Sequence, residues 1–181
     1  MDRELVIRAQ RGDQEAFATI VVGFGRQLHG LAQRVLRDVD LAEDATQRAL
    51  VSIWRDLPRL RDVDRFEAWC YRLVINACHT EGRRARRSRE GIRILPLDVQ
   101  IEDDATGMIV NRDELERGFR RLSIDHRGVL MLHYYLDMSL DEIAGTVGIP
   151  PGTARSRLHH ATRSMRAVLE ADARPTARAA R

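Results

Sequence analysis

Residues 139–158 decide the fold, and they read SLDEIAGTVGIPPGTARSRL. Ser139 followed three residues later by Glu142 is a capping-box pattern, in which each side chain bonds to the other residue's backbone N–H and opens a helix. Gly148 supplies the left-handed residue that ends this helix, and Pro150-Pro151 prevents it from continuing. A second helix is expected to follow. Two helices joined by a tight turn predict a helix-turn-helix, whose second helix enters the major groove of DNA.

The second helix, which we expect to start near Thr153, separates apolar from polar residues. Leu158, Ala161, Met165 and Val168 recur at helical spacing and are expected to face inward. The outward face offers hydrogen-bond donors for phosphates and base edges and carries no carboxylate, which would repel DNA. The candidate residues for duplex DNA binding are Thr153, Arg155, Ser156, Arg157, His159, His160 and Arg163. A solvated face of an ordinary helical bundle is the alternative interpretation.

Three earlier segments also show the three-to-four spacing of buried helical stripes. The first follows a predicted break and N-cap at Gly12-Asp13. The second is expected to start at Asp40, with Glu43 completing a capping box, and to end at Pro58. The third starts near Phe66 and runs into an arginine-rich segment with no apolar face. No strand alternation is present, and the predicted fold class is therefore all-α.

The periodicity disappears between residues 91 and 112, where Pro96, Gly107 and an acidic run interrupt it. We predict two small helical domains, at 1–90 and 113–170, joined by a flexible acidic linker over 91–112. A disordered tail is expected over 171–181.

Composition excludes several classes of protein. The 181 residues are 44% hydrophobic and 31% charged, as in a soluble globular chain. No apolar run approaches the length of a membrane span, and the two cysteines favour a reducing, cytoplasmic location. All 30 basic residues are arginine, which suits phosphates and guanine edges. A GC-rich genome, which favours arginine codons, is the alternative explanation. No catalytic, zinc-binding or glycine-rich phosphate-binding pattern is present, so we expect neither an enzyme nor a cofactor.

The order and spacing of several segments along the chain resemble those of the extracytoplasmic-function (ECF) sigma factors of bacterial RNA polymerase. The resemblance covers roughly residues 4–169. The segments that carry the resemblance are Ala9–Phe17, Asp44 and Gln47 with Trp54, Phe66–Leu73 with Asn76, and Ser139–Leu158.

The resemblance implies a sigma-2 domain that binds core RNA polymerase and captures melted −10 promoter DNA, and a sigma-4 domain that reads the −35 element. The polymerase-binding residues it implies are Asp40, Glu43, Asp44, Gln47 and Trp54. The −10 residues it implies are Arg59, Arg61, Asp62, Arg72, Asn76, Arg83 and Arg84. The acids at the start of the helix are also explained by its dipole alone.

The chain departs from the family pattern at four positions. Arg48 stands where the family usually has an acid, and Ala49 where it usually has a bulky aromatic residue. His160 and Thr162 replace two cations of the recognition helix. Since histidine titrates near neutral pH, DNA binding is expected to gain a pH dependence.

The main alternative function is a conventional helix-turn-helix regulator that acts without core polymerase. The partners expected are core RNA polymerase and promoter DNA, with no membrane. The sequence leaves open whether an anti-sigma protein holds the chain inactive, and which promoter and signal it serves.

Overall fold

The computed structural model describes residues 1–91 and 109–178, with side chains for residues 1–88 and 115–168. These described residues contain helices and turns but no strand, which confirms the all-α prediction. The chain divides into two compact units, Met1–Val99 and Gln100–Arg181. The predicted flexible linker falls mostly on residues 92–108, which lie outside the described residues.

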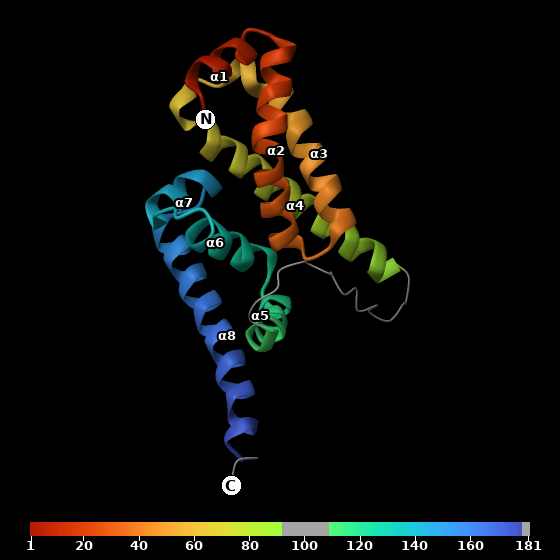
Figure 1. The fold of residues 1–181 in the computed structure, drawn as a ribbon, viewed down its shortest axis with the longest axis vertical. Coiled ribbons are helices and arrows are strands. Elements are labelled where there is room, and N and C mark those ends of the chain that lie inside the picture. The colour runs from red at the N-terminus through yellow and green to blue at the C-terminus, as the bar shows by residue number, and fades with distance from the viewer. Residues whose placement is uncertain (92–108, 179–181) are drawn as a thin grey trace. The chain divides into compact units, whose positions relative to one another are not determined.

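The first unit packs three long helices against one another, with a short helix laid across their end (Figure 1). Its described elements are α1 (Arg3–Gln10), α2 (Gln14–Leu36), α3 (Val39–Asp56), the 3-10 turns η1 (Leu57–Arg59) and η2 (Val63–Arg65), and α4 (Phe66–Gly91). The helix α1 packs on α2 and on both 3-10 turns.

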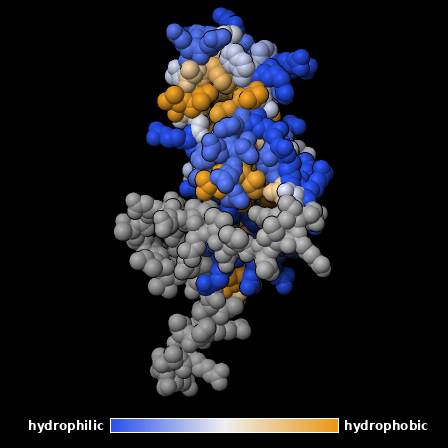
Figure 2. All heavy atoms as spheres, turned by 90° about the vertical axis from the view of Figure 1, so that its right-hand side faces the viewer, coloured by the Kyte–Doolittle hydropathy of each residue, from blue (hydrophilic) through white to orange (hydrophobic). Residues whose placement is uncertain are grey.

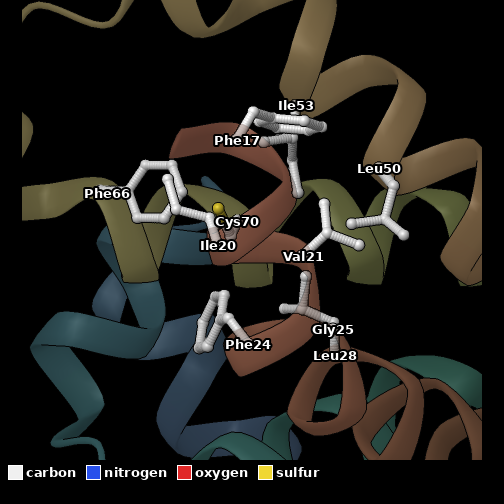
Figure 3. A pocket seen from close by; sticks show the side chains of 10 residues that line it. All are labelled: Phe17, Ile20, Val21, Phe24, Gly25, Leu28, Leu50, Ile53, Phe66 and Cys70. Atoms are coloured by element: carbon white, nitrogen blue, oxygen red, sulfur yellow. The ribbon is translucent and has the colours of Figure 1, made fainter. Parts of the chain in front are cut away.

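Apolar side chains from α2, α3 and α4 form the core of the first unit (Figure 3). Phe24 on α2 lies 5.5 Å from Tyr71 and 6.4 Å from Phe66, measured between ring centroids. The space between the side chains drawn in Figure 3 holds no cavity of water size. This interior is therefore a packed core rather than a ligand site.

The start of α3 differs from the sequence prediction. The N-cap is Asp38, whose carboxylate accepts a hydrogen bond of 3.0 Å from the backbone N–H of Leu41. Asp40 lies inside the first turn, and Glu43 accepts instead from Gln47. The predicted capping box at Asp40 is therefore wrong. Both aspartates can cap a helix, and Asp38 does so because its extended backbone stands directly after the turn that ends α2.

The second unit packs three helices against α8. Its described helices are α5 (Ile109–Arg121), α6 (Ile124–Tyr134), α7 (Leu140–Val147) and α8 (Pro151–Arg178). Ile143 and Ala161 are fully buried in this core. A Cβ added at Gly118 would lie 2.7 Å from the sulfur of Met165, so a larger residue at this position would require the flexible end of that side chain to move.

The helix-turn-helix forms as predicted. The Ser139–Glu142 capping box opens α7, and Gly148 ends it with a φ of 75°. Helix α8 starts at Pro151 rather than near Thr153, because proline fits the first helical position, where no backbone N–H is needed.

Parts of the two segments that were predicted to be unstructured, on either side of this unit, are helical. Helix α5 already begins at Ile109, and α8 continues to Arg178, so residues 171–178 are helical where a disordered tail was expected. Extending an existing helix needs no new nucleus.

Candidate functional site

The start of α8 exposes most of the predicted duplex-binding residues. Ala154 and Ala161 are fully buried, as the helical spacing requires, and the opposite face is open to solvent. Thr153 is half-buried. The exposed predicted residues are Arg155, Ser156, His159, His160 and Arg163. Among the described side chains of α8, residues 151–168, none is a carboxylate.

Arg157 does not join this exposed set. Its guanidinium Nη1 lies 2.7 Å from Oδ1 of Asp125 on α6, and only 26% of its side chain is exposed. The ion pair holds α8 against α6. Arg157 therefore supports the helix-turn-helix unit rather than extending its open face.

His126 on α6 lies beside the recognition helix and was not anticipated from the sequence. Its ring centroid is 6.4 Å from that of His160, which in turn is 5.9 Å from His159. Burial lowers the pKa of His126, Asp125 raises it, and the positive charges of His160 and Arg157 lower it. No local sequence signal could have placed His126 beside His160, because the two residues come from separate helices.

The segment between α3 and α4 presents three exposed arginines, of which Arg59 and Arg61 were predicted and Arg65 was not. Asp62 is exposed too, but its carboxylate accepts from the backbone N–H of Asp64 at 3.1 Å and lies 3.4 Å from the guanidinium of Arg65. Asp62 therefore stabilises η2.

Helix α4 carries the other residues implied for −10 DNA. Arg72, Asn76 and Arg83 are exposed, and their spacing places them on one face of the helix. Arg84 lies on another side, where its guanidinium is 3.5 Å from the carboxylate of Glu81.

The exposed side of α3 is acidic and continues into an apolar groove. Asp40, Glu43, Asp44 and Gln47 are all exposed at helical spacing, and Trp54 follows on the same face.

The Trp54 ring lies 4.7 Å from that of Phe17 on α2. The groove is open and measures about 520 Å³, and its lining residues are Gln14, Phe17, Val21, Leu50, Val51 and Trp54. Hydrophobic surface also reaches the exterior in the upper part of Figure 2.

Arg48 and Ala49, the two residues of α3 that depart from the family pattern, both have a structural explanation. Arg48 donates from Nε to Oε1 of Glu81 at 2.6 Å, and the Glu81 side chain is only 3% exposed. Ala49 is buried in the core. Sequence reasoning noted the reversed charge at position 48 but missed Glu81, which lies 33 residues away.

The remaining metal-ligating side chains of the described residues do not form a site. Within residues 1–88 and 115–168, no cluster of three histidine, cysteine or acidic side chains fits a metal ion. Cys70 and Cys78 are buried, and burial raises the pKa of Cys78 to about 12 and raises that of Cys70 as well. No described helix is long and apolar enough to span a bilayer.

Two family models match the chain, one on each unit. Sigma-70 region 2 matches residues 20–88, and Sigma-70, region 4 matches residues 112–165.

Several curated proteins and solved structures are similar over most of their length. The RNA polymerase sigma-H factor of Pseudomonas aeruginosa is 30% identical over 93% of this chain and 94% of its own. The ECF RNA polymerase sigma factor SigM of Mycobacterium tuberculosis is 31% identical over 86% of this chain and 78% of its own. The structure of CnrH in complex with the cytosolic domain of CnrY is 25% identical, covers 94% of this chain and 98% of that chain, and has a TM-score of 0.66. RpoE of Bartonella quintana, solved with the anti-sigma factor NepR, is 21% identical, covers 86% of this chain and 98% of that chain, and has a TM-score of 0.72.

Proposed function

Since this chain belongs to the sigma-70 family as an ECF sigma factor, which directs transcription by core RNA polymerase, we propose that its two units read two separate promoter elements. The second unit reads the −35 element as duplex DNA, and the first captures unpaired bases of the −10 element. The open, carboxylate-free start of α8 is the observation that carries this proposal.

The proposal for the −35 element rests on the residues that α8 exposes. Arg155, Ser156 and His159 lie in the first turns of the helix, where base contacts of a recognition helix concentrate. A bidentate arginine–guanine pair contributes about 1–3 kcal/mol of discrimination. Arg163, about two turns further along, is assigned to the phosphate backbone, which attracts cations without reading sequence.

The proposal for the −10 element rests on the turn after α3 and the exposed face of α4. Taking a base out of the stack costs a few kcal/mol, which a basic surface and a pocket must offset. Arg59 and Arg61 supply positive charge at the turn, and Arg72, Asn76 and Arg83 extend it along α4. Because this surface would hold the unpaired strand, the duplex would reanneal more slowly.

The acidic side of α3 and its adjoining groove are the proposed docking surface for core polymerase. Asp44 and Gln47 supply polar contacts, and Trp54 with its apolar neighbours supplies apolar surface that loses its water when the partner binds. This combination is typical of stable interfaces. An anti-sigma protein is a further proposed partner, as RpoE of Bartonella quintana was solved with the anti-sigma factor NepR. Such a protein would compete with polymerase for this surface.

Run-off transcription with core polymerase on fragments of the source genome tests the proposal. Wild-type protein should produce discrete transcripts that core polymerase alone does not make. Arg155→Ala should lower their yield by the equivalent of about 1–3 kcal/mol. Arg166→Ala is the matched control, because Arg166 is also exposed on α8 but lies about three turns beyond Arg155.

Two results would contradict the proposal. Wild-type yield from Arg155→Ala would remove the recognition helix from promoter reading. Tight sequence-specific binding of promoter duplex by the chain alone, with no effect of core polymerase, would favour the conventional regulator instead.

A further inference from the structure

We infer that Gln10, at the end of α1, is a positioning residue for the turn that captures the −10 base. The inference rests on the function proposed above for that turn. It concerns a residue outside the match to Sigma-70 region 2, which begins at residue 20.

The Gln10 side chain bridges two backbone positions of the turn. Its Nε2 donates to the carbonyl of Leu60 at 2.6 Å and to that of Leu57 at 3.3 Å. Both partners are acceptors, so only the amide nitrogen of Gln10 fits between them. These bonds span 47 and 50 residues of sequence and are partly buried, which shields them from competition by water.

The two bonded carbonyls lie on either side of Arg59 and directly before Arg61. Leu57 is fully buried and anchors the start of the turn, and Arg59 lies between it and Leu60. Arg61 follows Leu60 directly and precedes Asp62, whose carboxylate is bound to the backbone of Asp64. The backbone is therefore held on both sides of Arg61, by Gln10 on one side and by the η2 cap on the other.

Holding the backbone in this way reduces the number of directions in which the two arginines point. A turn fixed before DNA arrives does not lose that conformational freedom on binding, so base capture is stronger and more selective. Helix α1 itself packs against both η1 and η2, which keeps Gln10 in reach of the turn (Figure 1).

The test uses two substitutions that share only the loss of the amide donor. Gln10→Glu places a carboxylate against two carbonyl oxygens, whereas Gln10→Leu is neutral and similar in size. Gln33→Glu, on α2 away from the turn, is the matched control for the added charge. Each variant is assayed as holoenzyme on the strongest promoter fragment from the run-off experiment, with each −10 base and each −35 base changed in turn.

We expect both Gln10 variants to lose about fivefold of the discrimination between cognate and changed −10 bases, the factor that one ordinary hydrogen bond corresponds to. Discrimination at −35 bases, affinity for core polymerase and the behaviour of Gln33→Glu should stay at the wild-type level. A merely structural role would instead lower transcription on all templates alike, and that result would overturn the inference. Unchanged −10 discrimination in either folded Gln10 variant would overturn it as well.

Arg61→Ala separates this inference from the proposed function on which it rests. If Arg61→Ala keeps wild-type −10 discrimination, the turn does not read the −10 element, and both ideas are rejected. If Arg61→Ala loses discrimination while both Gln10 variants keep it, only the role of Gln10 is rejected.

Discussion

Replacing Arg48 tests whether the reversed charge on α3 is a structural necessity. Arg48 donates to Oε1 of Glu81 at 2.6 Å, and Glu81 is almost fully buried on α4. A buried carboxylate without a cation is strongly unfavourable, because it has lost its hydration. Arg48→Ala should therefore destabilise the first unit, and Arg48→Glu, which restores the family's usual acid, should destabilise it more.

The structure limits the size of the effect. Removing one partner of a fully buried ion pair costs about 3–5 kcal/mol. Arg48 is half-exposed, and Arg84 remains 3.5 Å from the other carboxylate oxygen of Glu81. We therefore expect Arg48→Ala to cost about 1–3 kcal/mol of unfolding free energy, the range for a buried polar group left without its partner. For a unit of this size each kcal/mol lowers the melting temperature by about 4–8 °C.

Tryptophan fluorescence during urea unfolding measures this effect in the full chain. The only two tryptophans, Trp54 and Trp69, both lie in the first unit, so the signal reports that unit alone. Arg84→Ala is the control, because its guanidinium is more exposed and further from Glu81, and it should cost much less. The exchanged pair Arg48→Glu with Glu81→Arg should recover part of the loss. An unfolding free energy for Arg48→Ala within about 0.5 kcal/mol of wild type would refute the reasoning.

Two further predictions concern the second unit. Its stability should fall as the pH drops below about 6.5, because burial lowers the pKa of His126 and the unfolded chain then takes up a proton that the folded unit resists. His126→Asn should flatten this dependence between pH 7 and 5 in urea unfolding followed by circular dichroism; an unchanged slope would assign the effect to another group. Gly118→Ala should change the stability of the unit by less than about 1 kcal/mol, because the new methyl lies 2.7 Å only from the flexible end of Met165, which can move, and alanine is the better helix former. In a Met165→Ala background the same change should stabilise by up to about 1 kcal/mol, since alanine is the better helix former, and destabilisation there would contradict this explanation.

The helices and their local ends could be predicted from the sequence because short-range interactions determine them. The Ser139–Glu142 box, the Gly148 terminus and the Asp13 cap each involve residues within four positions of one another. Where two such signals compete, the sequence is ambiguous. Asp38 and Asp40 are both good caps, and the geometry of the preceding turn selects Asp38.

The contacts that define the sites could not be predicted in the same way, because they join distant positions. Arg48 with Glu81, Arg157 with Asp125 and Gln10 with Leu60 are separated by more than 30 residues, and only the packing of helices brings them together. The charge reversal at position 48 is a usable signal in principle, since a changed charge at one position calls for a partner elsewhere. It does not say which of the acidic residues is that partner.

Ion pairs, both local and long-range, also distinguish arginines that lie close together in the sequence. Three sets of neighbours illustrate this: Arg61 and Arg65, Arg83 and Arg84, and Arg155 and Arg157. In each set the second arginine lies against a carboxylate, which belongs to Asp62, Glu81 and Asp125 respectively. The first arginine of each set is exposed, and so are Arg65 and Arg84, whereas only 26% of the Arg157 side chain is exposed. Since the salt dependence of DNA binding scales with the number of phosphates that are neutralised, a count of arginines in this chain overstates that number. We therefore expect Arg61, Arg83 and Arg155, rather than the total positive charge, to contribute most to the proposed binding of DNA.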